Sequence, residues 1–135
     1  MQESPALAGC LYLVVEDEYL AASSLMTALE DEGAKIAGPV SNVAAALALV
    51  RKRAFELDGA ILDINLRGAS VYPVAEKLSE YKIPFVFVTG YECDSLPEPF
   101  RAAPCLNKPC DEQELLEVLA GLPRRQMRSG MHPAN

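Results

Sequence analysis

The chain alternates short apolar runs with segments whose apolar residues repeat at helical spacing. Five runs stand out, at residues 11–15, 35–40, 60–62, 85–88 and 105–106. Between the first two, one stripe at i, i+3, i+4 and i+7 consists of Ala22, Leu25, Met26 and Leu29. Runs without polar alternation are typical of strands covered on both faces. The pattern therefore predicts an α/β fold with a doubly wound, five-stranded parallel sheet.

The connection between the fourth and fifth runs departs from this pattern. A helix is expected between Gly90 and Pro104, but Pro97 and Pro99 both fall inside it. An interior proline costs a helix about 3 kcal/mol, because it removes a hydrogen-bond donor and clashes with the preceding turn. We therefore expect a shortened or irregular fourth helix, either a single turn or a loop.

The periodic pattern occupies most of the chain. Its 135 residues fit one domain. We expect an N-terminal tail over 1–8, one folded domain over 9–122, and a disordered, Arg-rich C-terminal tail over 123–135. No second folded unit is predicted, so the domain is expected to act without an output domain of its own.

Charge and hydropathy narrow the range of partners and locations. The net charge of −7 disfavours direct binding to nucleic acid. No stretch approaches the roughly 20 apolar residues of a membrane helix. Leu7-Ala8-Gly9-Cys10 looks like a lipoprotein signal, but the residues before it contain Glu3 and neither Lys nor Arg. A cytoplasmic protein without a membrane partner is expected.

The four cysteines, at positions 10, 93, 105 and 110, form no C-x-x-C pair. The only histidine is His132, in the predicted C-terminal tail. A zinc site needs clustered ligands, so the sequence does not predict one. Free thiols are expected instead.

Acids and one lysine follow the predicted strands. Glu16 and Asp17 follow the first strand, Asp63 the third, Thr89 ends the fourth, and Lys108 follows the fifth. In a parallel sheet the carboxyl ends of the strands share one edge, where ligands bind. Two carboxylates about 4 Å apart repel by roughly 4 kcal/mol at an effective dielectric near 20, so a cation is expected among them. Hard oxygen ligands favour Mg²⁺, and the lysine suggests that an anion binds as well.

Four motifs then resemble the receiver domains of two-component response regulators, in family order and spacing, over roughly residues 10 to 121. They are Val14-Val15-Glu16-Asp17-Glu18, Leu62-Asp63-Ile64-Asn65-Leu66, Val88-Thr89-Gly90 and Lys108-Pro109. The resemblance implies the flavodoxin-like (CheY-like) fold with strand order 2-1-3-4-5. The segment Phe87–Tyr91 further resembles, imperfectly, a motif of stand-alone receivers from alphaproteobacteria.

The resemblance also implies roles for individual residues. Asp63 looks like the phosphoacceptor, and Glu16, Asp17, Asp63 and the backbone carbonyl of Asn65 look like the Mg²⁺ ligands. Lys108 would pair with a phosphoryl oxygen, and Thr89 would turn its hydroxyl toward the phosphoryl group. A cis Lys108–Pro109 peptide bond is implied as well.

Three positions depart from the family pattern. Cys105 stands where the family often has an aromatic residue that moves with the switch threonine, Thr89. Tyr91 either takes over part of this switch role or is a half-buried loop aromatic; both interpretations stay open. Arg67 stands where proline is common.

The implied function is Mg²⁺-dependent acceptance of a phosphoryl group from a sensor histidine kinase or a phosphotransfer protein. Its output would be a phosphorylation-dependent protein–protein interaction, or withdrawal of phosphate as a sink. The downstream partner and a homodimer stay open. No enzymatic activity is expected beyond its own phosphorylation and dephosphorylation.

Two alternatives remain. One is a degenerate receiver that binds its partner without phosphate. The other is an aspartyl-phosphate phosphatase, but that class places a second Asp two residues after the nucleophile, where this chain has Asn65.

Overall fold

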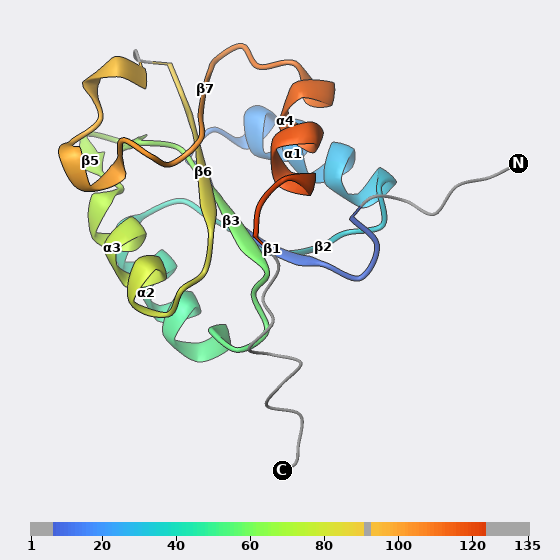
Figure 1. The fold of residues 1–135 in the computed structure, drawn as a ribbon, viewed down its shortest axis with the longest axis horizontal. Coiled ribbons are helices and arrows are strands. Elements are labelled where there is room, and N and C mark those ends of the chain that lie inside the picture. Colours follow the sequence, from blue (N-terminus) through green and yellow to red (C-terminus); the bar gives the residue numbers. More distant parts are fainter. Residues whose placement is uncertain (1–6, 91–92, 124–135) are drawn as a thin grey trace, which may run out of the picture.

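The computed structural model of the chain describes residues 7–90 and 93–123. Five parallel strands form the main sheet, in the order β2-β1-β3-β6-β7 (Figure 1). These strands are β1 (Leu11–Val15), β2 (Lys35–Val40), β3 (Gly59–Leu62), β6 (Phe85–Thr89) and β7 (Cys105–Asn107). Numbered along the chain, the order is 2-1-3-4-5, so the predicted fold class is confirmed.

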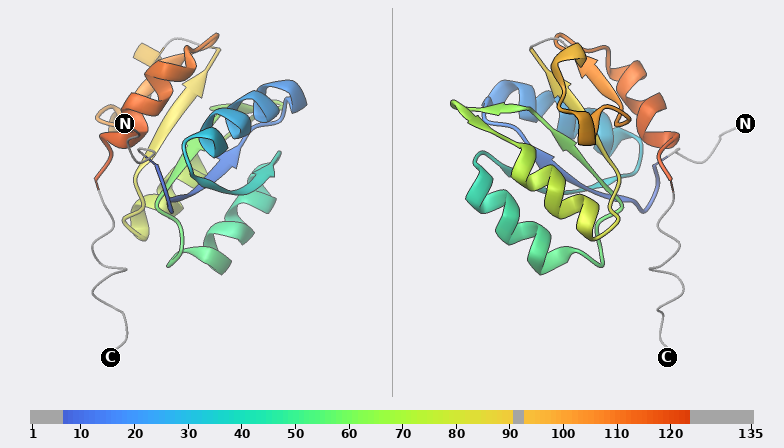
Figure 2. Two further views of the ribbon diagram at one scale, coloured as in Figure 1. Left: turned by 90° about the vertical axis from the view of Figure 1, so that its right-hand side faces the viewer. Right: turned by 60° about the vertical axis from the view of Figure 1, so that its left-hand side comes forward.

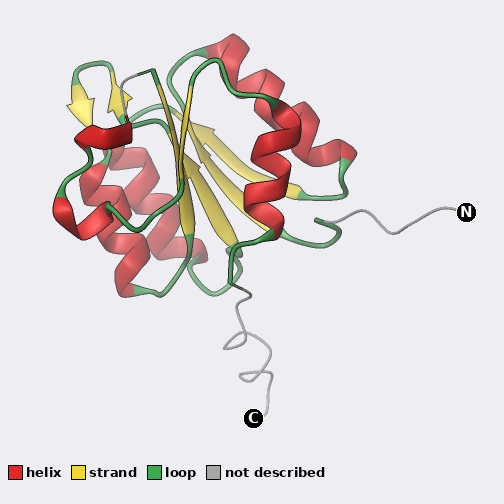
Figure 3. Ribbon diagram, turned by 45° about the horizontal axis from the view of Figure 1, so that its top comes forward, coloured by secondary structure: helices red, strands yellow, loops and turns green. Residues whose placement is uncertain are grey.

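Helices cover both faces of the sheet, as Figures 2 and 3 show. The helices are α1 (Tyr19–Asp31), α2 (Val43–Arg53), α3 (Tyr72–Glu80) and α4 (Glu112–Ala120). Helices α2 and α3 contact each other on one face, and α1 and α4 contact each other on the opposite face. Successive residues of β1 point to opposite faces, so Leu13 and Val14 enter two separate apolar clusters. This burial on both sides explains why the central strands lack polar alternation.

The predicted irregularity of the fourth helix is confirmed. Among the described residues of the connection from β6 to β7, the helical elements are two short 3₁₀ turns, η1 (Cys93–Ser95) and η2 (Glu98–Phe100). Phe100 is buried and stacks on Tyr72 with ring centroids 5.3 Å apart. Two buried side chains, Leu96 and Phe100, therefore hold this segment against the core in place of a full helix.

A small hairpin, which the sequence pattern did not predict, follows β3. Its strands are β4 (Asn65–Leu66) and β5 (Ala69–Ser70), which pair antiparallel. The two turn residues, Arg67 and Gly68, have φ of 55° and 90°. Positive φ at both central residues is the geometry of a type I′ turn, which matches the twist of a two-residue hairpin. Because Leu66 is buried, the hairpin is held on the core.

Two expectations need correction. Leu7, assigned to the N-terminal tail, is buried and packs in the same apolar cluster as Val14. The prediction of free thiols is wrong for Cys93 and Cys105, which form a disulfide across a separation of 12 residues. The fold brings η1 beside β7, a proximity that spacing along the chain does not reveal.

The other two cysteines, Cys10 and Cys110, are not part of a disulfide. Most of both predicted tails, residues 1–6 and 124–135, and the predicted switch residue Tyr91 lie outside the described residues. Across residues 7–90 and 93–123, none of the helices has both the length and the apolar character needed to cross a membrane.

Candidate functional site

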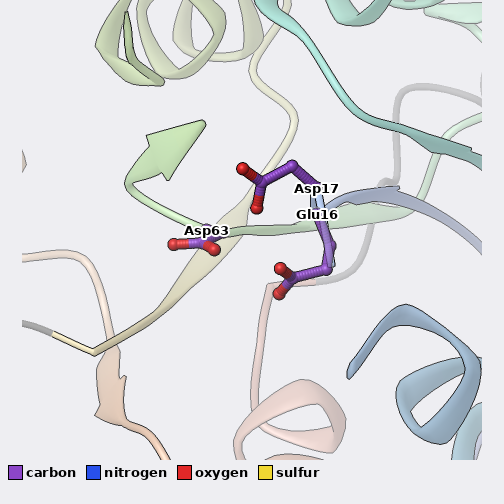
Figure 4. A group of neighbouring side chains, drawn as sticks. All are labelled: Glu16, Asp17 and Asp63. Atoms are coloured by element: carbon purple, nitrogen blue, oxygen red, sulfur yellow. The ribbon is translucent and has the colours of Figure 1, made fainter. Parts of the chain in front are cut away.

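Three carboxylates meet at the carboxyl edge of the sheet because of the strand register. Val15 pairs with Leu62 at the ends of the adjacent strands β1 and β3. The next residues, Glu16 and Asp63, therefore leave the sheet at the same level. Together with Asp17 they surround a common space (Figure 4), and one oxygen of each lies within 4.8 Å of the other two. The structure thus brings together the three acids predicted as metal ligands.

Lys108 reaches this cluster from the end of β7. Its Nζ lies 2.9 Å from Glu16 Oε1 and 3.0 Å from Asp63 Oδ2. The peptide bond between Lys108 and Pro109 is cis, as the family resemblance implied. Backbone groups hold the other carboxylate oxygens, since the N–H of Glu18 donates to Glu16 Oε2 and that of Asn65 donates to Asp63 Oδ1. In the part of the chain that the structure describes, no buried side-chain polar atom lacks a partner.

The burial of these charges changes their proton affinities. Desolvation raises the pKa of the Glu16 carboxyl above its usual value, although the hydrogen bond from Lys108 opposes this change. Desolvation lowers the pKa of the Lys108 ammonium, but hydrogen bonds with Glu16 and Asp63 outweigh it and raise the pKa above its usual range. Lys108 therefore stays positively charged between the two acids at neutral pH.

The donor set fits a hard divalent cation. Three carboxylates face one another with no nitrogen or sulfur ligand among them, and a single lysine balances only part of their charge. Oxygen ligands of this kind suit Mg²⁺, which keeps several of its waters and adds a phosphate oxygen when one is present. An open depression beside the acids would admit both, and its lining includes Asp17, Asp63, Asn65, Arg67, Gly90 and Lys108.

The predicted switch residues are placed as follows. Thr89 is buried at the end of β6, and its backbone carbonyl accepts a hydrogen bond from the N–H of Lys108 at 2.7 Å. Cys105 pairs with Phe87 on the neighbouring strand and is bonded to Cys93. The position where the family often has a mobile aromatic side chain therefore holds a covalent cross-link.

Two charged residues join the site that sequence reasoning did not include among its ligands. Arg67, at the tip of the β4–β5 hairpin, places Nε 3.9 Å from Asp17 Oδ2. Glu18 places Oε1 3.6 Å from the Nζ of Lys108. The position of Arg67 depends on the left-handed turn with Gly68, and the Arg-Gly pair alone did not predict that turn. Glu18 belongs to the first sequence motif, but only Glu16 and Asp17 of that motif were predicted to be metal ligands.

Comparison with known families decides the relationship. The model of the response regulator receiver domain matches residues 12–120, which include all five strands of the main sheet except Leu11. The chain belongs to the receiver-domain family. Signalling by phosphorylation is general in this family, as is binding of Mg²⁺ at an acidic pocket.

Solved structures agree with this assignment. The chain is 44% identical to SdrG from Sphingomonas melonis Fr1, with a TM-score of 0.73 over 85% of this chain and 95% of that one. It is also 44% identical to SdrG in the BeF3-activated conformation, named as from Pseudomonas melonis Fr1, with a TM-score of 0.70 over 84% and 95%. The receiver domain of PhyR from Erythrobacter litoralis is 25% identical, with a TM-score of 0.73 over 89% and 98%. Comparison with curated proteins gives no match.

Proposed function

We propose that this receiver domain accepts a phosphoryl group on Asp63 from a sensor histidine kinase or a phosphotransfer protein, in a reaction that requires Mg²⁺. The observation that carries the proposal is the contact of Asp63 with Lys108 inside a cluster of three carboxylates. A lone buried aspartate would be a structural residue. Asp63 contacts the positively charged Lys108 and lies in a carboxylate cluster that could also hold Mg²⁺. These two positive charges favour the binding of an anion at Asp63.

The transfer itself needs few groups from the protein. An oxygen of Asp63 attacks the phosphorus of a phosphohistidine, and an O–P bond forms while the P–N bond breaks. The electron pair of the broken bond stays on the imidazole nitrogen. Positioning and charge neutralisation make up most of the catalysis in such transfers. When bound, Mg²⁺ supplies positive charge for the phosphoryl oxygens, and Glu16, Asp17, Asp63 and the backbone carbonyl of Asn65 would hold it.

Lys108 and Thr89 then respond to the product. Phosphorylation places about −1.5 to −2 charge on Asp63. Lys108, already 3.0 Å from that side chain, pairs with a phosphoryl oxygen. The Thr89 hydroxyl turns toward the phosphoryl group, and the loop after β6 moves with it. This movement changes the surface that a protein partner binds.

Exposed apolar side chains beside the site support a protein as the phosphodonor. Tyr19 and Leu20, at the start of α1, are 81% and 80% exposed. They follow directly after Asp17 and Glu18 in the chain, and those two residues line the depression. Apolar side chains so exposed are frequent in surfaces that bind other proteins.

Incubation with Mg²⁺ and acetyl phosphate tests the proposal. Intact-mass spectrometry should show a gain of about 80 Da, the mass of one added phosphoryl group, and Asp63→Asn should lose it. Asp31→Asn, an exposed change at the end of α1, serves as the matched control and should keep the gain. A gain that persists in Asp63→Asn, or no gain in the unmodified protein with Mg²⁺ present, would refute phosphorylation at this residue.

The same preparation tests the two alternatives. A degenerate receiver would bind its partner equally well as the Asp63→Asn variant with the kinase present. A phosphatase would release many phosphates per protein from a phosphate ester, which requires a general acid to protonate the leaving group. Asn65 occupies the position of that acid in such enzymes, and its side chain instead accepts a hydrogen bond from the N–H of Gly68 at 2.8 Å.

A further inference from the structure

A covalent bond joins two segments beside the candidate site. Cys93 begins η1 and Cys105 begins β7, and their Cα atoms lie 5.8 Å apart. This separation falls in the range that a disulfide requires. Both residues are partly exposed, whereas Cys10, which forms no disulfide, is buried. An oxidant or a reductant in solution can therefore reach the pair.

The disulfide closes a loop over residues 93–105, which lies shortly after Thr89 in the chain. Thr89 ends β6 and pairs with Asn107 of β7, while Phe87 pairs with Cys105. Cys93 lies four residues after Thr89 in the chain. The disulfide therefore ties the segment that follows Thr89 back to the strand that leads to Lys108.

Few other contacts among the described residues hold the first part of this segment. None of the three residues of η1 is buried, and the first buried side chain after Gly90 among the described residues is that of Leu96. The N–H of Leu96 donates to the carbonyl of Cys93 at 3.4 Å, which is a contact within the segment itself. Two further described contacts are the hydrogen bond from Arg101 Nε to the Leu96 carbonyl at 3.4 Å and the approach of Cys93 Sγ to Asn107 Oδ1 at 3.5 Å. The disulfide is therefore the one covalent link from η1 to β7, beside the burial of Leu96 and these weak contacts.

We propose that Cys93 and Cys105 form a redox-modification site, oxidised by a peroxide or by a low-molecular-weight disulfide. The bond holds the segment after Thr89 against β7 and so opposes the movement that phosphorylation of Asp63 requires. The inference rests on the proposed function, because that function supplies the movement. Coupling of this kind is reciprocal, so phosphorylation would in turn favour the reduced pair.

The oxidation balances with a peroxide as oxidant. The thiolate of one cysteine attacks a peroxide oxygen, the O–O bond breaks, and an alcohol or water leaves with a proton. The thiolate of the other cysteine then attacks the sulfur of the sulfenic acid, and water leaves. Two thiols and one peroxide thus give one disulfide, one alcohol or water, and one further water. A small disulfide oxidises the pair by two successive exchanges, and a dithiol reverses the reaction.

Formation of the bond is tested first. Treatment of the dithiol-reduced protein with dilute hydrogen peroxide should lower its intact mass by about 2 Da, the mass of two hydrogen atoms. The same treatment should block alkylation of two thiols. Peptide mapping should locate the bond between Cys93 and Cys105. Cys110→Ser is the matched control and should behave as the unmodified protein, while Cys93→Ser should not form the bond. A disulfide formed through another pair, or no bond at all, would overturn the inference.

The effect on the site is tested with beryllofluoride and Mg²⁺ as the probe. Amide-shift titration should show that the reduced protein binds beryllofluoride at least about three-fold more tightly than the oxidised protein, a coupling near 0.7 kcal/mol. Cys93→Ser should bind as the reduced protein does, before and after peroxide. If that variant does not fold, the unmodified protein with and without a dithiol gives the same comparison.

The outcomes separate the two proposals. Equal affinity of the oxidised and reduced proteins, or tighter binding by the oxidised protein, overturns the redox inference and leaves the phosphoacceptor function intact. No binding of beryllofluoride in either state overturns the phosphoacceptor function, and the redox inference with it.

Discussion

Replacing Lys108 with methionine removes the one cation that the described residues place between Glu16 and Asp63. Each carboxylate lies about 3 Å from the ammonium, and the attraction of one such pair is about 6 kcal/mol at an effective dielectric near 20. Much of this attraction is offset by the cost of burying the lysine. What remains in the variant is the repulsion of two buried carboxylates, whose facing oxygens lie within 4.8 Å. At that separation it amounts to about 3.5 kcal/mol.

Protonation of one carboxylate limits the loss of unfolding free energy in the variant. One of the two acids can bind a proton, which costs about 3.5 kcal/mol at pH 7 for a carboxyl with an unfolded-state pKa near 4.5. The two estimates agree, so Lys108→Met should lose about 3 kcal/mol of unfolding free energy at pH 7 without divalent cations. The carboxyl pKa is raised in the folded variant, so its stabilising contribution is present at low pH and is lost as the pH rises. At pH 5 the gap should shrink to about 1 kcal/mol.

Urea unfolding monitored by circular dichroism measures these values. With m near 1–3 kcal/mol/M, the variant's midpoint should fall by about 1–3 M at pH 7 in the presence of a chelator. Mg²⁺ at ten times its dissociation constant should restore about 1.4 kcal/mol. Lys77→Met is the matched control, because Lys77 pairs at 2.9 Å with Glu80, which is 64% exposed. That change should cost at most about 1 kcal/mol and should not respond to Mg²⁺. A gap below 1 kcal/mol at pH 7, or one independent of pH, would refute the electrostatic argument.

Two further predictions concern Arg67 and Cys110. Arg67→Gln should tighten Mg²⁺ binding about two- to five-fold by calorimetry, because it removes a competing charge 3.9 Å from Asp17; the effect stays small since Arg67 is 74% exposed. Arg53→Gln on α2 should leave the affinity unchanged, and weaker binding by Arg67→Gln would contradict the prediction. Burial, and then the acids of α4, raise the pKa of the Cys110 thiol. Its alkylation rate should therefore rise at more alkaline pH in the folded protein than in urea, and coincident pH profiles would exclude the effect.

Most of the fold could be predicted from the sequence, because the signals were local. Buried strands such as Leu11–Val15 contain only apolar residues, and helical stripes such as that beginning at Ala22 repeat at a fixed spacing. Pro97 and Pro99 act on their own backbone, so they predicted the loss of the fourth helix correctly. The β4–β5 hairpin was missed, because two-residue strands carry no period and their turn contains an arginine with positive φ.

The candidate site was predictable for a related reason. Each of Glu16, Asp17, Asp63 and Lys108 directly follows or closely follows an apolar run, and parallel strands place such positions at one edge. Their order along the chain therefore sufficed to group them. Their contacts required coordinates, since the pairing of Lys108 with both Glu16 and Asp63 depends on strand register.

The sequence by itself determined which segments form the five strands of the main sheet and the four α-helices, and which charged groups stand at the ends of those strands. These properties depend on neighbouring residues and on the alternation of covered and exposed positions. Only the tertiary structure decided that Cys93 bonds with Cys105 and that Arg67 lies beside Asp17. Both contacts involve a residue in a connecting segment, Arg67 in the β4–β5 turn and Cys93 in the connection from β6 to β7. The conformation of these segments depends on how buried side chains such as Leu66 and Phe100 pack against the rest of the core. No periodic pattern in the sequence encodes that packing.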